Sequence, residues 1–497
     1  MSKLPVLSLI LWFQTKSHGV RVPLKSHEHR PHWYSFLSMG EMDRETRLDL
    51  FRARHNNTHA IEYYGEIQVG GQNLSVLFDT GSDQLLVPGA DCVSPACDTH
   101  RHYDESKSRT VRNQTDEDPK EVAFGTGTAM GYDQEDQVCL GDSCARVDFI
   151  EVVKESDDPF AHAGFDGVLG LSLKLRRDAT AKTSVLKALT ESKAIPAEMF
   201  SVFLSKDLHQ ESSEISFGTY SEERMDGPLH WVPLSEVAYW QFSLASISVG
   251  GKKLAICSEN STQVGKSVSS FFGHMCCRSL EEFEHEQRCQ FFSNYTETGN
   301  RSRYTDQGTI LASYEDGRVA VQLKDGCVQK VPREWLSLSD GCRGDGTIQA
   351  LLDTGSSLMM GPQNIVLSLL SAVGAQENCT TQIDKGFPSV SFTLPDGMEL
   401  TLAPEDYMDQ LVLGDGVYCW PHLIPMPETA KGAALVLGMP FLRAFYSVFD
   451  VAGARVGFAK AKQPQQSGSA KESQLSKLST SRNLRSVALH SRRPEGA

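Results

Sequence analysis

A five-residue stretch occurs twice in this chain and places an aspartate directly after an apolar run each time. The first copy is Phe78-Asp79-Thr80-Gly81-Ser82 and the second is Leu352-Asp353-Thr354-Gly355-Ser356. A carboxylate at the end of a buried strand is costly unless it is hydrogen-bonded or functional. A single copy is most simply an ordinary turn, but two copies in this setting indicate that the two aspartates meet.

Matched surroundings make the two copies parts of an internal repeat. Gly65–Gly71 (GEIQVGG) leads into the first copy, and Ala245–Gly251 (ASISVGG) is its counterpart before the second. The first aspartate lies 8 residues past the Gly-Gly pair, whereas the second lies 102 residues past it. A Val-Leu-Gly triplet ends 91 residues after the first aspartate and 85 residues after the second. The simplest account is a repeat whose second copy carries an insertion, residues 258–341.

Short apolar runs separated by glycine turns predict a mainly β chain from Ile61 onward. The repeat then predicts an N-terminal β lobe, residues 60–240, and a C-terminal β lobe, residues 241–462, related by pseudo-two-fold symmetry. A cleft between two such lobes is where a ligand usually binds. The chain has 497 residues, of which 40% are hydrophobic, and is long enough to give both lobes a core.

If the two loops face each other across that cleft, Asp79 and Asp353 lie within hydrogen-bonding range. Like charges that close do not both ionise easily, so the pair shares one proton at acidic pH. One carboxylate can then act as base and the other as acid on a trapped water, which suits amide hydrolysis without a covalent intermediate. In the flanking positions glycine allows close approach, threonine can cross-bond the loops and serine can donate to the carboxylates. These supporting residues are Thr80, Gly81, Ser82, Thr354, Gly355 and Ser356.

The first 19 residues have the pattern of a cleaved signal peptide. Lys3 precedes an apolar run from Leu4 to Phe13, and Ser17 and Gly19 place small residues at a cleavage site. The run is too short to span a membrane, and we expect no transmembrane anchor elsewhere. Seven Asn-x-Ser/Thr sequons agree with a secretory route, at Asn56, Asn73, Asn113, Asn260, Asn294, Asn300 and Asn378. The net charge of −15 argues against nucleic acid as a partner.

The two ends of the chain differ from the predicted lobes. Residues 20–59 are rich in arginine and histidine, with one short strand predicted at Arg21–Lys25 and one short helix at Asp43–Arg54. Two interpretations are open: a mobile arm, or an inhibitory pro-segment whose basic side chains pair with acidic groups until acid breaks the pairs. Histidine titrates in the range that such a switch requires. Residues 463–497 are rich in Ser and Gln, carry a net charge of +4 and are predicted to be a disordered tail.

The insertion has its own pattern. A capping box at Ser279 predicts a helix that runs through Cys289, and strands are predicted at Thr309–Ser313 and Arg318–Leu323. Its cysteines and nearby histidines suit either disulfides or a zinc site, and an oxidising lumen favours disulfides. We therefore predict no metal and no cofactor. The residues in question are Cys276, Cys277, Cys289, Cys327, His274 and His285.

Together with the repeated loops, several further stretches resemble those of the pepsin-like aspartic proteases over about residues 61–462, apart from the insertion. These stretches are Phe165–Leu171, Ile195–Pro196, Phe200–Ser205, Ile215–Gly218, Trp231–Leu234, Tyr239–Phe242, Leu437–Leu442 and Tyr446–Asp450. The resemblance implies a bilobal fold, catalytic Asp79 and Asp353, and aspartic endopeptidase activity at acidic pH, with the shared proton that is well known for such dyads. It also implies a monomeric zymogen, inhibited by its own pro-segment, whose polypeptide substrates bind extended in the cleft.

The resemblance further implies a flap hairpin over the cleft at Phe124-Gly125-Thr126-Gly127, and substrate contacts at Leu86 and Ser357. Two positions depart from the family pattern. The family usually has Tyr where Phe124 stands and Trp where Leu86 stands, and their hydroxyl and indole groups are hydrogen-bond partners. Loss of one partner would leave the polar group of the other without a hydrogen bond, whereas loss of both leaves a purely apolar contact. We therefore predict a coupled change that makes the pocket beside the dyad more apolar.

The family's disulfide frame also fits the cysteines of this chain. It implies the pairs Cys92–Cys97, Cys379–Cys419 and Cys257–Cys342, of which the last would span the insertion. Cys139 and Cys144 are additional and close enough to pair. That leaves the four insertion cysteines to pair among themselves.

A Phe at the flap, a cysteine-bearing insertion and the expected lack of a membrane anchor also resemble the plasmepsin-type proteases of apicomplexan parasites, above all the maturases that process proteins bound for secretory organelles. This narrower resemblance implies a processing protease of the secretory pathway, in an acidic endosome-like or vacuolar lumen, or a secreted one. The alternatives are a general degradative acid protease and a lumenal binding protein in which catalysis is incidental.

Overall fold

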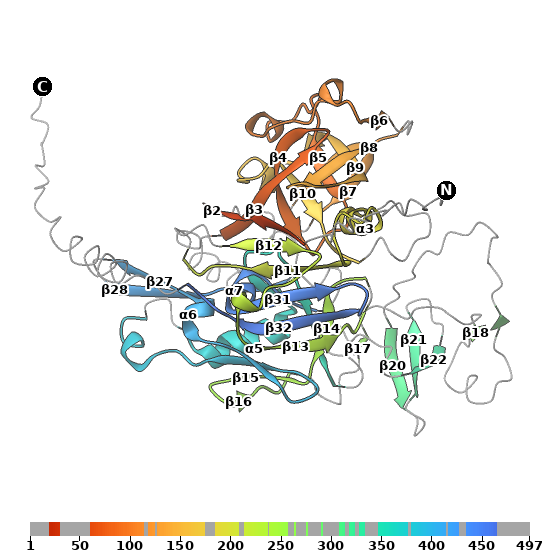
Figure 1. Cartoon of the computed structure of the whole chain (residues 1–497). Coiled ribbons are helices and arrows are strands. Elements are labelled where there is room, and N and C mark those ends of the chain that lie inside the picture. The colour runs from red at the N-terminus through yellow and green to blue at the C-terminus, as the bar shows by residue number, and fades with distance from the viewer. Residues whose placement is uncertain are drawn as a thin grey trace, which may run out of the picture.

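Two β-rich lobes make up the body of the protein, and the N-terminal lobe lies above the C-terminal lobe in Figure 1. This arrangement confirms the predicted mainly β, bilobal fold. The computed structural model describes residues 19–29, 60–113, 118–124, 127–173, 184–207, 213–236, 238–256, 346–375, 379–413, 416–426 and 434–464, together with short strands between Gln263 and Pro332.

A sheet of nine described strands forms the N-terminal lobe. Its central strands are apolar on both faces, and in β4 (Gln72–Asp79) every residue from Leu74 onward is buried. The strand order is β2 (Lys25–His29), β3 (Ala60–Val69), β4, β10 (Gly167–Gly170), β5 (Leu85–Pro88), β9 (Ser143–Glu155), β8 (Thr128–Leu140) and β6 (Arg112–Asn113), and β7 (Lys120–Ala123) also pairs with β8. The short helices α2 (Asp157–Phe160) and α3 (Val185–Glu191) follow β9 and β10 in the chain.

The C-terminal lobe contains three smaller sheets in the described residues. The first has the order β14 (Gln241–Leu244), β23 (Ile348–Leu352), β30 (Leu435–Leu437), β24 (Met359–Gly361) and β29 (Leu423–Pro425). The second has the order β16 (Lys252–Lys253), β15 (Ser246–Val249), β25 (Val390–Thr393) and β26 (Glu399–Leu402), and the third pairs β27 (Met408–Leu413) with β28 (Gly416–Pro421). The helices are α5 (Gln363–Val373), α6 (Pro404–Tyr407) and α7 (Met439–Ala444).

The internal repeat predicted from the sequence is visible in the backbone. The β3–β4 hairpin turns through Gly70 and Gly71 with φ of 56° and 79°, and the β15–β16 hairpin turns through Gly250 and Gly251 with φ of 57° and 76°. Glycine is suited to these turns because positive φ is unfavourable for other residues. In both lobes the strand before the repeated loop runs parallel to a Val-Leu strand, β10 or β30, which is antiparallel to a third strand, β5 or β24.

A six-stranded sheet lies between the lobes and takes its strands from distant parts of the chain. Its order is β1 (Val20–Pro23), β12 (Glu214–Phe217), β11 (Met199–Phe203), β31 (Phe445–Asp450), β32 (Arg455–Ala461) and β13 (Met225–Pro233). On one face the rings of Phe200 and Phe449 stack at 4.4 Å, and Trp240 packs edge-on against both. The indole of Trp240 donates to the carbonyl oxygen of Leu171, 2.8 Å away. One continuous apolar core therefore joins the lobes.

The opposite face of this sheet carries a smaller apolar cluster. Met225, Leu229 and Trp231 are half-buried there and pack against Phe203 and Tyr446.

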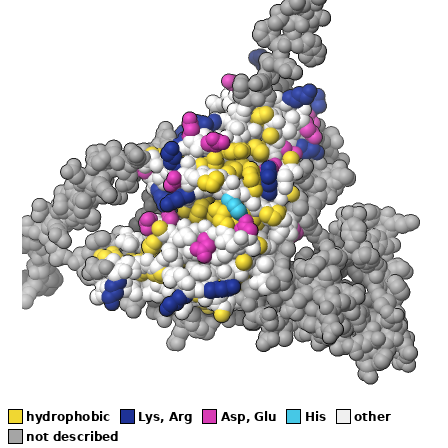
Figure 2. Space-filling model, turned by 60° about the horizontal axis from the view of Figure 1, so that its bottom comes forward, with side chains coloured by type: hydrophobic (Ala, Val, Ile, Leu, Met, Phe, Trp, Pro, Cys, Tyr) yellow, Lys and Arg dark blue, Asp and Glu magenta, His cyan; other side chains and the backbone are white. Residues whose placement is uncertain are grey.

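In Figure 2, apolar side chains gather in the middle of one face of the molecule, and charged side chains of both signs border them. The surface thus combines an apolar area with a mixed-charge rim.

The N-terminal segment is not separate from the lobes, which corrects part of the sequence prediction. The single strand expected at Arg21–Lys25 is two strands, β1 and β2, which break at Leu24. They belong to different sheets, because β1 pairs with β12 and β2 pairs with β3. Sequence alone did not reveal this, since both pairings are long-range. The helix predicted at Asp43–Arg54 lies outside the described residues.

The insertion contributes two small sheets in its described parts. Its strands are β17 (Gln263–Val264), β18 (Met275–Cys276), β19 (Gln290–Phe291), β20 (Gly308–Ser313), β21 (Arg318–Leu323) and β22 (Val328–Pro332). The strands predicted at Thr309–Ser313 and Arg318–Leu323 correspond to β20 and β21. The helix predicted from Ser279 lies outside the described residues.

The predicted tail begins with a residue that is held against the body. The side-chain amide of Gln463 donates to the carbonyl oxygens of Leu204, 3.1 Å away, and Arg443, 2.8 Å away. Residues 465–497 lie outside the described residues. Among the helices that are described, none is both long and apolar enough to cross a membrane.

Candidate active site

The two repeated aspartates converge where two parallel strand pairs end. β4 ends at Asp79 beside Gly170 of β10, and Asp353 directly follows β23. A Cβ atom added to Gly81 would lie 3.1 Å from side-chain oxygens of both aspartates. One added to Gly355 would lie 2.5 Å from Oδ1 of Asp79 and 3.3 Å from Oδ1 of Asp353. Both positions require glycine because the carboxylates occupy the space that a larger side chain would need.

The threonines of the two loops cross-bond the lobes. The hydroxyl of Thr80 donates to the carbonyl oxygen of Leu352 and accepts from the amide of Thr354, at 2.9 and 3.0 Å. In return the hydroxyl of Thr354 donates to the carbonyl oxygen of Phe78 and accepts from the amide of Thr80, at 2.5 and 3.0 Å. Because both side chains are buried, these bonds fix the two loops against each other.

The electrostatics of the pair favour one shared proton. Burial raises the pKa of Asp79, and the Ser82 hydroxyl and the amide of Gly81 partly oppose that rise. Burial raises the pKa of Asp353 well above its usual value, and the nearby charge of Asp79 raises it further. The amides of Gly81 and Gly355 each donate to the carboxylate of their own loop at 2.8 Å. These amides orient the carboxylates, while the proximity of the two carboxylates disfavours double ionisation.

The second loop's serines bind backbone groups and not the dyad. The hydroxyl of Ser356, expected to donate to a carboxylate, donates to the carbonyl oxygen of Leu358 at 3.0 Å. Ser357, expected to contact substrate, donates to the carbonyl oxygen of Ile61 in β3 at 2.8 Å. Ser356 therefore shapes its own loop, and Ser357 ties the C-terminal loop to the N-terminal lobe.

A hairpin stands at the predicted flap position. It is built from β7 and the start of β8, and the amide of Phe124 donates to the carbonyl oxygen of Gly127 at 2.7 Å. Gly125 and Thr126, between these two residues, lie outside the described residues. The described residues that border the tip of this hairpin therefore lie at the position where the sequence predicts the flap.

The second arm of this hairpin is tied to the loop after β9. The Ser156 hydroxyl accepts from the amide of Thr128 at 3.0 Å, and the Ser156 amide donates back to the Thr128 carbonyl at 2.9 Å. A Cβ atom added to Gly127 would lie 2.2 Å from the carbonyl oxygen of Asp158. Gly127 therefore allows the flap to approach this loop closely.

The wall between the flap and the dyad is apolar. Phe124 packs edge-on against Phe160, with ring centroids 5.6 Å apart. It also packs against the cluster that contains buried Leu86, so the two positions that depart from the family pattern share one apolar environment. A neighbouring cluster holds Leu77 and Val168, which belong to the strands that position Asp79.

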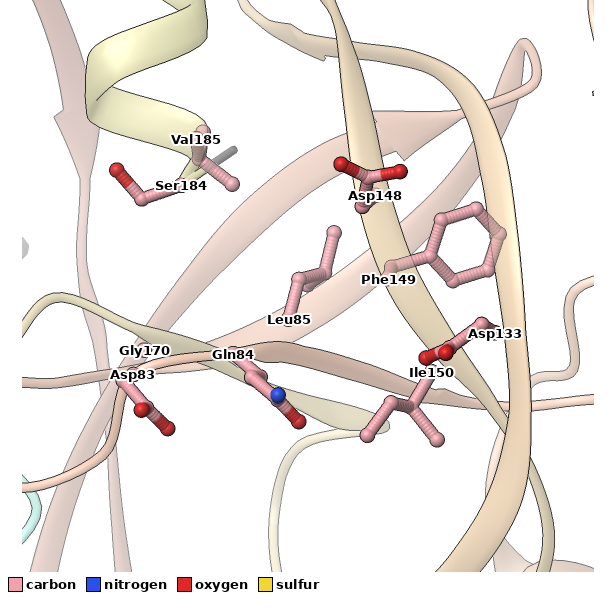
Figure 3. Close-up of a pocket in the computed structure, with 10 residues that line it drawn as sticks. All are labelled: Asp83, Gln84, Leu85, Asp133, Asp148, Phe149, Ile150, Gly170, Ser184 and Val185. Carbon is pink, nitrogen blue, oxygen red and sulfur yellow. The ribbon is translucent and has the colours of Figure 1, made fainter. Parts of the chain in front are cut away.

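A separate small cavity lies beside the strand that follows the first loop. Figure 3 shows Asp83 and Gln84 on one side of it and Asp133 and Asp148 on the other. Asp133 forms an ion pair with Lys120 of β7. The carboxylate of Asp83, next to Ser82 of the first loop, therefore lines this cavity.

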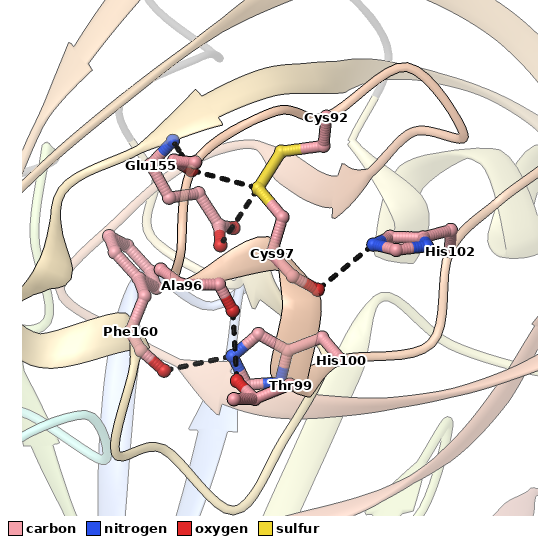
Figure 4. Close-up of a disulfide and its surroundings, with 9 residues drawn as sticks. Cys92, Ala96, Cys97, Thr99, His100, His102, Glu155 and Phe160 are labelled. Carbon is pink, nitrogen blue, oxygen red and sulfur yellow. Dashed lines mark hydrogen bonds between the residues drawn. A yellow bond between two sulfur atoms is a disulfide. The ribbon is translucent and has the colours of Figure 1, made fainter.

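The structure contains three disulfides among the described cysteines: Cys92–Cys97, Cys139–Cys144 and Cys379–Cys419. Figure 4 shows the first of these, with Glu155 and His102 close by. Cys139 and Cys144 are cross-strand neighbours in the β8–β9 hairpin. The pair Cys257–Cys342 and the pairing of Cys276, Cys277, Cys289 and Cys327 lie outside what the structure describes.

Two buried carboxyls near the site were not anticipated from the sequence. Burial raises the pKa of Glu155, the last residue of β9, to about 7. Burial also raises the pKa of Glu62 to about 7, although a hydrogen bond from the backbone of Gly164 partly opposes the rise. In sequence these residues look like ordinary polar positions of a strand, and only the strand pairings bury them.

A third unanticipated feature is an ion-pair network upstream of the dyad. Asp166 accepts from the amide and hydroxyl of Ser75 at 2.7 and 2.9 Å, which locks β10 to β4 four residues before Asp79. Arg101 adds a 2.9 Å bond to Asp166 and also pairs with Glu66. No local sequence signal predicts partners that lie 65 residues apart.

The comparisons with known proteins agree with this geometry. The family profile described as "Eukaryotic aspartyl protease" matches residues 62–271 and 300–461. Cathepsin E of Mus musculus is 29% identical over 486 residues, which cover 92% of this chain and 98% of the relative. Cathepsin E of Cavia porcellus is 30% identical over 416 residues, 81% of each chain, and Procardosin-A of Cynara cardunculus is 26% identical over 449 residues, 82% of this chain and 84% of the relative.

The profile covers both lobes and both aspartate loops, and it breaks only inside the predicted insertion, at residues 272–299. The relatives align over most of their own length as well as over most of this chain. The chain therefore belongs to the eukaryotic aspartyl protease family, the pepsin-like aspartic endopeptidases.

Proposed function

We propose that Asp79 and Asp353 are the catalytic pair of this endopeptidase and act on a water held between them. The observation that carries this assignment is their convergence, since a Cβ atom added to Gly81 would lie 3.1 Å from oxygens of both side chains. The ionised carboxylate accepts a proton from the water, and the protonated one donates to the carbonyl oxygen of the scissile amide. When the tetrahedral species collapses, the leaving amine takes up the proton that the base removed from the water, and a hydroxyl of the tetrahedral carbon returns a proton to the acid. No covalent enzyme intermediate forms.

The walls of the site favour apolar substrate side chains next to the scissile bond. Phe124 of the flap hairpin packs in one apolar cluster with Phe160 and with Leu77, which belongs to the strand that carries Asp79. Such a surface binds apolar groups by removing them from water. A polypeptide substrate would lie extended beneath the flap hairpin, where backbone groups can pair with it.

A secretory zymogen fits the remaining features. Residues 1–19 would be removed as a signal peptide, and residues 20–59 would serve as the pro-segment that inhibits the enzyme before activation. The three described disulfides suit an oxidising lumen. Because the pair needs one proton, activity should be greatest in an acidic compartment of the secretory or endosomal route.

Within that setting a processing role, like that of the plasmepsin-type maturases, is the narrower proposal. It depends on the Phe at position 124, the cysteine-bearing insertion and the expected lack of an anchor. A general degradative protease is the alternative within the same chemistry. The alternative without catalysis as its main role is a lumenal binding protein. However, both Asp-Thr-Gly loops are complete and their threonines cross-bond, which a binding role alone would not require.

Cleavage of a denatured protein at pH 5 tests the assignment. The wild-type protein, activated by acid or by cleavage within residues 30–59, should degrade the substrate, and Asp79→Asn should lose at least about 100-fold of that activity. Thermal melts of both proteins control for folding, since the substitution preserves size. Equal cleavage by the two folded proteins would exclude a catalytic role for Asp79.

A further inference from the structure

We propose that residues 20–29 remain bound to the mature enzyme as a non-covalent light chain after the N-terminal segment is processed. This inference rests on the proposal that the protein is made as a zymogen, and it specifies which part of the N-terminal segment is lost on activation. Of the segment 20–59, only the connection between β2 and β3 would be expendable. We call residues 20–29 the N-terminal arm.

The first half of the arm is part of the core between the lobes. β1 pairs with β12 through four residues, from Val20 to Pro23, and forms the edge of the six-stranded sheet. Val22 and Leu24 are only 3% and 5% exposed and belong to the main hydrophobic core. The amide of Leu24 donates to the carbonyl oxygen of Ser213 at 2.8 Å. Removal of this strand would uncover apolar core and the edge of β12.

The second half of the arm belongs to the N-terminal lobe. β2 pairs with β3 through five residues and forms one edge of the nine-stranded sheet. The same strand β3 receives the hydrogen bond of Ser357 at Ile61, one residue from the start of β3. Loss of β2 would therefore expose an edge of the strand that contacts the second catalytic loop.

The body of the protein is shaped to receive the arm. A Cβ atom added to Gly65 would lie 2.9 Å from Cγ1 of Val22 and 3.0 Å from the carbonyl oxygen of Pro23. One added to Gly164 would lie 2.7 Å from Cβ of His27. Neither glycine has a positive φ, so neither is needed for a turn. Both allow a close approach of the arm, one beneath β1 and the other beneath β2.

The strand pairing shows why a cut would not release the arm. His29, the last residue of β2, is the cross-strand partner of Ala60, the first residue of β3. The connection between them therefore starts and ends at the same point of the sheet. Its excision requires no movement of either strand, and every described contact of the arm survives the cut. A signal-peptide cleavage after Gly19 would likewise leave β1 whole.

Cleavage at a designed site tests retention directly. A recognition sequence for a specific protease is placed within residues 30–59 of the full chain that carries Asp79→Asn, so that self-cleavage does not contribute. After digestion, gel filtration at pH 5 and pH 7 followed by intact mass measurement should find the N-terminal fragment with the body in equal amounts. Separation of the fragment from a folded body would overturn the proposal.

A matched pair of substitutions tests whether the described contacts hold the fragment. Val22→Ala removes buried methyl groups and should speed release of the fragment by at least about tenfold. Lys25→Ala changes an exposed position of the same arm and should leave the release rate unchanged. Equal release rates for the two variants would contradict the proposed binding mode.

The naturally processed enzyme gives an independent readout. Sequencing of the acid-activated wild-type protein should give two N-termini in equal yield, one at or near Val20 and one after His29. A single N-terminus downstream of His29 would overturn retention. If wild-type protein stays uncut, the zymogen proposal fails, but the digestion of the Asp79→Asn protein still decides whether the arm is retained.

Discussion

The hydroxyl of Thr354 bonds at once to the carbonyl oxygen of Phe78 and to the amide of Thr80, both in the opposite lobe. Removal of this hydroxyl would leave buried backbone groups unpaired, at a cost of about 1–3 kcal/mol. We expect Thr354→Ala to lower the stability by that amount. We also expect it to reduce kcat about 10- to 100-fold, since the carboxylates would lose their alignment.

Thr354→Ser is the matched control, because it keeps the hydroxyl and removes only a methyl group. Urea unfolding and peptide hydrolysis at pH 5 measure the two effects. If the Ala and Ser variants have the same kcat, the cross-loop bonds do not align the dyad.

A second prediction at the level of single residues concerns the two departures from the family pattern. Phe124→Tyr alone should lower kcat/KM a few-fold, because the new hydroxyl enters the apolar cluster that contains Leu86. The double variant Phe124→Tyr with Leu86→Trp should recover activity, since it restores a hydrogen-bonding pair. Hydrolysis of one peptide by the single and double variants completes the cycle. An improvement from Phe124→Tyr alone would show that the two changes are not coupled.

Sequence reasoning found the residues of the dyad loops because a repeated motif is visible without knowledge of the fold. It also predicted the cross-bonding threonines, which the structure shows. It placed the hydroxyl of Ser356 on a carboxylate, whereas that hydroxyl donates to the carbonyl oxygen of Leu358 in its own loop. It did not predict that Ser357 donates to Ile61 in the N-terminal lobe. Local sequence gives the type of a side chain but not its distant partner.

At the scale of single elements, the flap depends on its contact with the loop after β9. Gly127→Ala would force a Cβ atom against the carbonyl oxygen of Asp158 and push the hairpin away from its place. We expect KM for a peptide substrate to rise about tenfold or more, with little change in global stability, because the hairpin lies at the edge of the lobe. Peptide hydrolysis and thermal melts separate the two effects. An unchanged KM would show that the flap does not need this close contact.

A carboxyl group at the end of β9 makes the stability of the folded protein depend on pH. The pKa of Glu155 is about 7 in the folded protein, against an ordinary value of 4.5. The folded state therefore keeps a proton that the unfolded state loses, and stability falls as the pH rises from 4.5 to 7. The shift corresponds to about 3 kcal/mol. Glu155→Gln should flatten this decline by about that amount.

Urea unfolding at pH 4.5, 6 and 7.5 measures the effect. Glu223→Gln, at an exposed position, is the control and should leave the decline unchanged. Glu62 has a similarly raised pKa and should still contribute its own decline in the Glu155→Gln variant. A variant curve parallel to that of the wild type would show that Glu155 is not the group that titrates.

The strands and hairpins could be predicted from the sequence less completely than the residues of the dyad loops. The hairpins of the repeat follow from glycine positions and alternating apolar residues, which are local signals, whereas the flap was expected from the resemblance to the pepsin-like proteases. The division of Arg21–Lys25 into β1 and β2 was missed, because each strand is defined by a partner far along the chain, Glu214–Phe217 or Ala60–Val69. Edge strands have little hydrophobic pattern of their own, so their sheet decides their structure.

At the scale of the whole molecule, the matched spacing of the repeat was enough to predict two lobes and a central dyad. The six-stranded sheet between the lobes was not predictable in the same way, since it draws strands from residues 20–23, 199–233 and 445–461. Such non-local pairing leaves no periodic signal in any one segment. The sheet also makes the N-terminal arm and the end of the folded chain parts of one core.

The insertion is the part of the molecule that this common core does not require. In the described residues its strands pair only with one another, in the β17–β20–β21–β22 and β18–β19 sheets. The C-terminal lobe closes without it, because β14 pairs directly with β23 on the other side of the insertion. Replacement of residues 258–341 by a short Gly-Ser linker should therefore leave a folded enzyme, in which Cys257 and Cys342 can still form their predicted disulfide.

If the insertion is a docking element for large substrates, its deletion should separate two activities. Hydrolysis of a short peptide should stay within about threefold of the wild type, because the dyad and flap are untouched. Cleavage of a large protein substrate should fall about tenfold or more, since a second contact raises the local concentration of substrate at the cleft. Both assays are run at pH 5 on the same preparation, and a thermal melt checks that the deletion variant is folded. Unchanged cleavage of large substrates would exclude docking, and loss of the folded state would make the insertion a structural part of the C-terminal lobe.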